Sequence, residues 1–194
     1  MKHGPVSWRV ITPPAAEPVS VVLAKANCRV THTHEDALFA LWIEAARRHA
    51  EAVLGRAIIT QTIAAKFDTW DTILRLPRPR LQLVDSVTYL DPDGVEQTAS
   101  ADLYDVDIDS EPGRVLLTPG EAWPDILAAP QAVTVTYTAG YGDSGDDVPG
   151  NIREAILMAV GAWNENRENI VAPGAVELPF AVRQQLMHDR VYIE

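Results

Sequence analysis

The segment Ala132-Val-Thr-Val-Thr-Tyr-Thr-Ala-Gly-Tyr-Gly142 alternates β-branched and aromatic residues with polar ones and then breaks at two glycines. This period-two pattern predicts a half-buried β-strand over residues 132–139. An acidic loop of residues 143–147 follows, and Pro149 then begins a long helical pattern. This stretch is therefore expected to form a strand, a glycine corner, a loop and a helix. It contains no catalytic motif.

Two helices are expected before the strands, over residues 20–29 and 33–54, and a third over residues 149–166. In the second, Thr33 is the expected N-cap and Gly55 the expected stop. Its apolar residues recur with a period near 3.6 and predict a buried stripe of Leu38, Leu41, Trp42, Ala45, Ala52 and Val53. The corresponding stripe of the third helix is Ile152, Ile156, Ala159, Val160 and Trp163.

Short strand patterns fill the region between these helices. The sequence predicts strands at residues 58–70, 73–76, 83–90, 103–108, 115–117 and 132–139. Turn-forming residues at 91–94 and 110–113 separate neighbouring strands. Helices, then strands, then helices indicate an α+β fold rather than alternating βαβ units: a helical bundle of two or three main helices with a small antiparallel β-structure.

The chain ends are expected to be arms. Four prolines within residues 1–18 predict an extended N-terminal arm. A central domain of residues 19–169 follows, with its β-structure in residues 58–139. The last part, residues 170–194, is a tail with one short helix over residues 180–188.

Composition limits the classes of function. Lys and Arg number 16 against 27 Asp and Glu, a net charge of −11 that disfavours tight sequence-independent DNA binding. A single cysteine fits a reducing compartment and excludes an internal disulfide framework. We find no signal peptide and no apolar run long enough to cross a membrane, so a soluble intracellular protein is expected.

A metal site was considered at His32 and His34, which precede Glu35 and Asp36. Two histidines two residues apart do not share a helix face, although a loop would allow both to reach one ion. The alternative interpretation is a solvated helix start with acids favoured by the helix dipole. The usual catalytic signatures are missing from the sequence. We therefore assign no catalytic, cofactor or metal residue and expect a protein that is not an enzyme.

Two acidic groups are candidate surfaces. Along a predicted strand, period two places acids on one face, where they form a negative surface, a cation site or only a polar exterior. A second group lies in the acidic loop, whose spacing does not match a calcium loop. The candidate residues for a negative surface that faces something anionic are Asp105, Asp107, Asp109, Glu111, Asp143, Asp146 and Asp147.

Aromatic and basic residues outside the helical stripes suggest contacts with other chains. Trp8 lies in the proline-rich arm without a local core, which is typical of a docking residue. Three arginines are spread around Pro77 and Pro79, which would hold the segment extended. The arginines would then point outward, toward acidic residues of a neighbouring subunit or toward phosphate. The alternative is an ordinary charged turn. The candidate inter-subunit residues are Trp8, Arg75, Arg78 and Arg80, and the candidate docking residues of the tail are Phe180, Arg183, Leu186 and Met187.

An ordered set of short segments, spread over nearly the whole chain, resembles the head–tail connector (adaptor) proteins of tailed bacteriophages and of phage-derived gene transfer agents. The set, not any single motif, carries the resemblance. The segments are Val10–Val19, Glu35–Leu38, Leu54–Arg56 with Thr60–Thr62, Leu76–Pro79, Ser86–Tyr89, Asp109–Arg114, Val133–Gly142, Val148–Ile152, Trp163–Arg167 and Leu178–Phe180. Residues 30–34 depart from the usual, more acidic pattern, which leaves the role of the two histidines open.

The resemblance implies a structural function without an active site. Adaptor subunits form a ring under the portal at the capsid vertex and extend the DNA channel toward the tail. The implied partners are the portal protein, a stopper or tail-completion protein and further copies of the chain in a dodecamer. Double-stranded DNA passes without specific binding, and no membrane is involved. The implied location is the head–tail junction of a virion or phage-like particle assembled in the bacterial cytoplasm. The alternatives are a head-completion stopper, a tail terminator or, less favoured, a metal-dependent enzyme.

Overall fold

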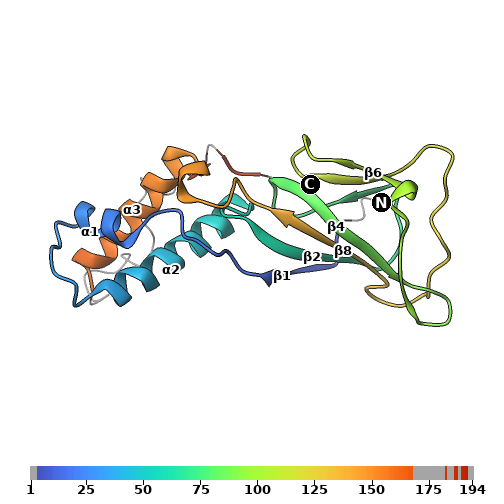
Figure 1. Ribbon diagram of the computed structural model, residues 1–194, viewed down its shortest axis with the longest axis horizontal. Helices are drawn as coiled ribbons and strands as arrows, with labels where there is room; N and C mark the ends of the chain where they lie inside the picture. Colours follow the sequence, from blue (N-terminus) through green and yellow to red (C-terminus); the bar gives the residue numbers. More distant parts are fainter. Residues whose placement is uncertain (1–3, 168–181, 183–185, 188, 192–194) are drawn as a thin grey trace. The chain divides into compact units, whose positions relative to one another are not determined.

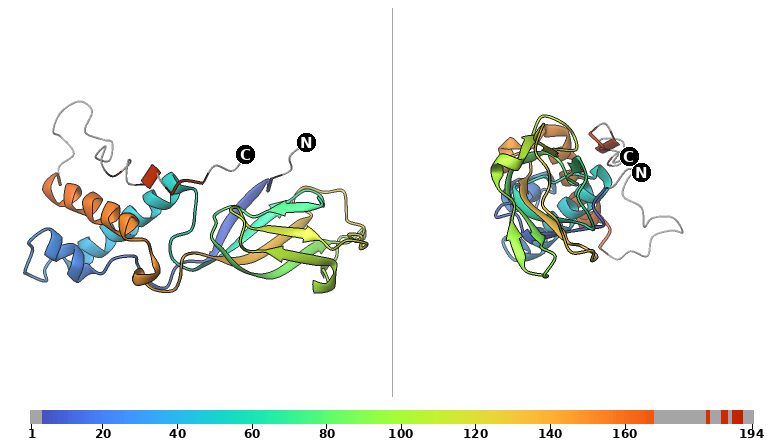
Figure 2. Two further views of the ribbon diagram at one scale, coloured as in Figure 1. Left: turned by 90° about the horizontal axis from the view of Figure 1, so that it is seen from above. Right: turned by 90° about the vertical axis from the view of Figure 1, so that its right-hand side faces the viewer.

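The computed structural model of the chain describes residues 4–167, 182, 186–187 and 189–191, which divide into two compact units (Figure 1). The helical unit contains residues 15–59 and the described residues from 141 onward. The sandwich unit contains residues 4–14 and 60–140. Its strands can be followed in two further views (Figure 2). Helices and antiparallel strands are thus segregated along the chain, and the expected α+β class is confirmed.

Three helices build the helical unit: α1 (Val21–Asn27), α2 (Asp36–Leu54) and α3 (Gly150–Glu165). Ser20 caps α1 by accepting a hydrogen bond from the Leu23 backbone N–H at 3.1 Å. Gly55, at φ 72°, ends α2 as predicted. The predicted cap of α2 is wrong, because Glu35 occupies the N-cap position and makes no side-chain cap bond.

The buried face of α2 differs from the predicted stripe. Leu41 is 60% exposed, and Ala45 and Ala52 are also exposed. The core side of the helix carries Phe39, Ile43, Ala46, Arg47, Ala50, Glu51 and Leu54. A search for apolar periodicity counts Arg47 and Glu51 as polar. The apolar stripe that it finds is therefore shifted by about one position from the buried face. The stripe of α3 is confirmed, since Ile152, Ile156, Ala159 and Val160 are buried and Trp163 is partly buried.

The described C-terminal residues pack on the helical unit. Val182 and Leu186 are each 1% exposed and belong to the same apolar core as α2 and α3. The Val191 backbone N–H donates to the Leu54 carbonyl at 2.9 Å. These residues are therefore part of the core of the helical unit and do not form a free arm.

The larger sheet of the sandwich unit has five antiparallel strands in the order β1-β2-β8-β4-β5. Their bounds are β1 Ser7–Thr12, β2 Gln61–Phe67, β8 Val133–Ala139, β4 Leu81–Leu90 and β5 Glu96–Thr98. The predicted strand at 132–139 is confirmed as the central β8. Its valines and Tyr137 are buried, and its threonines lie on the opposite, half-exposed face.

The smaller sheet has three antiparallel strands in the order β3-β7-β6. They are β3 Ile73–Arg75, β7 Arg114–Leu117 and β6 Tyr104–Asp107. Leu74 and Val115 of this sheet are fully buried, as are Val87 and Val135 of the larger one. Two sheets therefore enclose an apolar core, which is more β-structure than the small element expected from the sequence.

Residues 7–12 are not a free arm. They form β1, which pairs with β2 and places Trp8 opposite Ala65. Extended backbone was correctly predicted from the prolines, but the pairing was not. It joins segments more than 50 residues apart, and no local pattern reports such a partner.

Candidate assembly surfaces

The candidate inter-subunit residues lie in different parts of the sandwich unit. Trp8 is 40% exposed on the edge strand β1, and the Arg78 guanidinium lies 4.5 Å from the centroid of its ring. Arg75 is half-buried at the end of β3, the edge strand of the smaller sheet. Arg80 is exposed just before β4, an interior strand. The structure therefore brings Trp8 and Arg78 together at one edge.

The carboxylate of Asp107 is held by hydrogen bonds, unlike that of a free surface acid. Its carboxylate accepts hydrogen bonds from the Arg114 guanidinium and from the Ser110 hydroxyl, the latter at 2.6 Å. These bonds, led by that from Ser110, hold the pKa of Asp107 well below its ordinary value of 3.8. Asp105, Asp109 and Glu111 are exposed. Asp107 therefore fixes the turn between β6 and β7. Of the four acids, it is the least suited to a surface along which DNA would move.

The acidic loop is also partly structural. Its residues 145–147 form a short 3₁₀ helix, η2. The Asp147 carboxylate accepts from the Ser144 backbone N–H and hydroxyl, each at 3.0 Å, and closes a capping box. Asp146 pairs with Arg153 at 3.2 Å but stays 90% exposed, and Asp143 is exposed. All three acids are exposed, and Asp143 and Asp146 are the two that take no part in the capping box.

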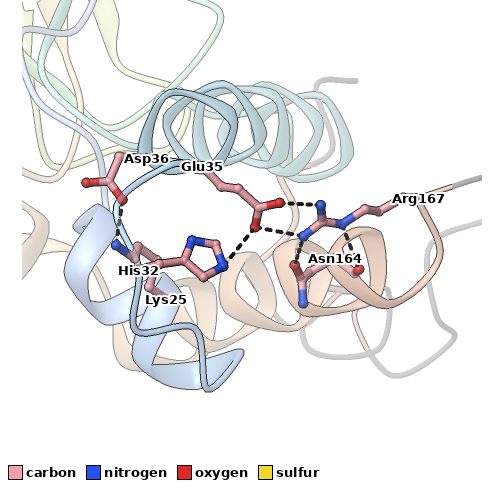
Figure 3. Close-up of polar contacts among 6 residues, drawn as sticks. All are labelled: Lys25, His32, Glu35, Asp36, Asn164 and Arg167. Atoms are coloured by element: carbon pink, nitrogen blue, oxygen red, sulfur yellow. Dashed lines mark hydrogen bonds and ion pairs between the residues drawn. The ribbon is translucent and has the colours of Figure 1, made fainter.

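His32 lies against a carboxylate that already has a partner (Figure 3). The Arg167 guanidinium makes a two-pronged contact with Glu35, one arm at 2.9 Å, and the His32 Nε2 lies 3.9 Å from the same carboxylate. The hydrogen bond from Arg167 holds the pKa of Glu35 below its ordinary value. This group connects the start of α2 to the end of α3, a role that the sequence did not reveal.

Among the residues that the structure describes, no three His, Cys, Asp or Glu side chains are grouped to hold a metal ion. Burial raises the pKa of the Cys28 thiol, which opposes a nucleophilic role at neutral pH. A hollow of about 510 Å³ lies in the helical unit beside Pro18, Leu23 and Arg153. Ser20, the hydroxyl on its wall, is engaged as the α1 cap. These features give no support to the alternative of a metal-dependent enzyme.

The tail residues proposed for docking are only partly visible. Phe180 and Arg183 lie outside the described residues. Leu186 is buried in the helical core, so its side chain is not available to a partner in this state, whereas Met187 is 37% exposed. No helix in the described part of the chain is long and apolar enough to cross a membrane.

Comparisons with known proteins identify the fold. Neither a family model nor a curated protein matches the sequence. Three solved structures of gene transfer agent (GTA) particles contain similar chains, each 19% identical, with 97% of both chains covered. The TM-score is 0.81 for the neck of an empty particle with C6 symmetry and 0.76 for a native virion. It is 0.74 for the neck of a native particle with C12 symmetry. The chain therefore has the fold of a chain found in these particles, from end to end.

Proposed function

We propose that this protein is a structural subunit of the neck of a tailed, phage-like particle, where it forms a ring that joins head to tail. The observation that carries the proposal is the likeness to a chain in a particle neck, at a TM-score of 0.81 over 97% of both chains. A match of that extent includes both units and leaves little of the chain for a different function. The similar necks have C6 or C12 symmetry, which supports a cyclic homo-oligomer.

Within the neck, the adaptor position under the portal is the role we favour. The resemblance of the ordered sequence segments to adaptors supports this choice. The portal and a stopper or tail-completion protein are then the partners, and the head–tail junction is the location. A stopper or tail terminator is the second candidate, because it would occupy the same neck at a different height.

DNA would pass through such a ring without being held. A net charge of −11 gives a surface that repels phosphate, and release of counterions cannot then drive tight binding. Asp143 and Asp146 are the exposed acids that we propose to face the duplex in the helical unit. Such a wall would let DNA slide under packaging pressure instead of adhering.

Cryo-electron microscopy of particles from a producing strain tests the proposal. We expect density for this chain as a ring in contact with the portal, and heads that lack tails or lose DNA when its gene is deleted. A ring separated from the portal by another protein would support the stopper role instead of the adaptor role. Intact tailed particles assembled without this protein would overturn the neck function altogether.

A further inference from the structure

The sandwich unit has one edge that is basic and apolar. β1 ends the larger sheet and β3 ends the smaller one, and Arg78, in the link that follows β3, lies over the Trp8 ring of β1. Arg9 is exposed on β1. The exposed apolar residues here are Val6 at 57%, Trp8 at 40%, Val10 at 41% and Ile11 at 49%. We call this surface, with Arg9, Arg75 and Arg78, the basic edge.

The opposite edge is acidic and also apolar. β5 ends the larger sheet and β6 ends the smaller one, and residues 99–103 connect the two strands directly. All three residues of β5 are exposed. The exposed apolar residues are Val95 at 55%, Val106 at 38% and Ile108 at 47%. We call this surface, with the exposed acids Asp93, Glu96, Asp105 and Asp109, the acidic edge.

The charges are segregated in the sequence itself. Residues 81–113 contain nine acidic residues and no Lys or Arg, whereas residues 1–16 and 72–80 contain no Asp or Glu. The first range supplies β4, β5 and β6, and the other two supply β1, β3 and the link that follows β3. The division of charge between the two edges is therefore a property of whole segments and does not depend on one side chain.

We propose that the basic edge of one copy docks on the acidic edge of the next copy around the ring. The inference rests on the proposed function, because a ring needs a head-to-tail contact between two different surfaces of each subunit. Each edge repels its own kind, which opposes closed dimers, and attracts the other, which favours a chain of copies in one direction. The exposed apolar residues on both edges supply the surface that becomes buried, and the charges fix which edges meet.

A second copy fits the basic edge better than DNA does. Phosphate offers nothing to cover Val6, Trp8 and Val10, whose exposure costs free energy in a monomer. The acidic edge, with its exposed Val95, Val106 and Ile108, offers both cover and countercharge. Unpaired edge strands normally carry features that prevent pairing with other chains. Here the charge of each edge favours docking of the oppositely charged edge and disfavours docking of an identical edge.

Charge reversal in matched pairs tests the contact. R9E/R75E makes both edges acidic, and E96K/D105K leaves the acidic edge without net charge while the basic edge is unchanged; the wild-type side chains are exposed or half-buried. We expect each double variant alone to associate more than about tenfold more weakly than the wild type. The chain with all four substitutions should form rings again. An equimolar mixture of the two double variants should also assemble, as alternating rings with an even number of subunits.

Native mass spectrometry of full-length protein, with and without its co-expressed portal, counts the subunits, and circular dichroism checks that each variant remains folded. Rings of the wild type together with undiminished rings of both double variants would overturn the contact and leave the neck function standing. So would intact rings accompanied by loss of DNA binding in R9E/R75E, because DNA would then be the occupant of the basic edge. A wild type that forms no ring even on its portal would overturn the neck function and the contact together.

Discussion

Arg47 of α2 and Glu17 form a two-pronged ion pair, with Nε donating to Oε2 at 2.8 Å and Nη2 to Oε1 at 3.1 Å. On its other side, Arg47 donates to Glu51 at 3.1 Å, and Glu51 accepts from the backbone N–H of Ile58 at 3.1 Å. Glu17 lies where the chain enters the helical unit, and Ile58 lies where it leaves. One arginine in the middle of α2 therefore ties both points to the same helix.

Replacing Arg47 with Met should destabilise the helical unit by about 3–5 kcal/mol, because two carboxylates lose their countercharge in a buried setting. The Arg47 and Glu51 side chains are only 6% and 10% exposed. Urea unfolding followed by far-UV circular dichroism measures the loss. The matched control is Arg48→Met, since Arg48 is 72% exposed and pairs with Glu44 at 3.4 Å. Its loss should stay below about 0.5 kcal/mol. Similar losses in both variants would show that burial of the Arg47 pair contributes nothing.

The Arg47 example shows what the sequence could and could not predict. The i, i+4 spacing predicts the pairing of Arg47 with Glu51. It does not predict that the pair is buried, because a search for an apolar stripe places charged residues on the exposed face of a helix. β8 was predictable because alternation, β-branched residues and glycines agree. The place of β1 was not, since its partner β2 lies far along the chain. The basic edge and the acidic edge likewise could not be predicted, because the strand order defines which strands lie at an edge.

Asp107 should make the sandwich unit acid-sensitive. Its pKa is lowered in the folded protein, first by the hydrogen bond from Ser110 and then by Arg114, so folding favours the ionised form. The contribution is present above the ordinary pKa of 3.8 and is lost as pH falls below it. Asp107→Asn should therefore be less stable than the wild type at neutral pH and approach it in acid. Urea midpoints at several pH values, read from tryptophan fluorescence, provide the measurement. A difference between the two proteins that does not change with pH would exclude Asp107 as the titrating group.

Tyr137 should contribute a buried hydrogen bond from β8 to the link between β3 and β4. Its hydroxyl donates to the Pro77 carbonyl, its side chain is fully buried, and burial raises the pKa of the phenol. Tyr137→Phe removes the donor, keeps the ring and leaves a buried carbonyl without its partner, at a cost of about 1–3 kcal/mol. The half-exposed Tyr89 gives the control, and Tyr89→Phe should change stability by less than about 0.5 kcal/mol. Thermal unfolding would compare them, and a neutral Tyr137→Phe would mean that water replaces the phenol at no cost.

Gly145 lies where two passages of the chain approach each other within the helical unit. A Cβ atom added there would be 2.4 Å from the Pro18 carbonyl oxygen and 2.9 Å from its carbon, and both are backbone atoms that cannot rotate away. Gly145→Ala should therefore separate residues 145–147 from Pro18 and cost about 1–3 kcal/mol.

Gly150, at the start of α3, provides the matched control for that substitution. A Cβ atom there meets nothing within 4 Å, and alanine favours helix, so Gly150→Ala should be neutral or stabilising by up to about 1 kcal/mol. Thermal unfolding of both variants gives the comparison. Equal stability of the two alanine variants would show that the passage at Pro18 yields easily, and that its close approach does not hold the acidic loop in place.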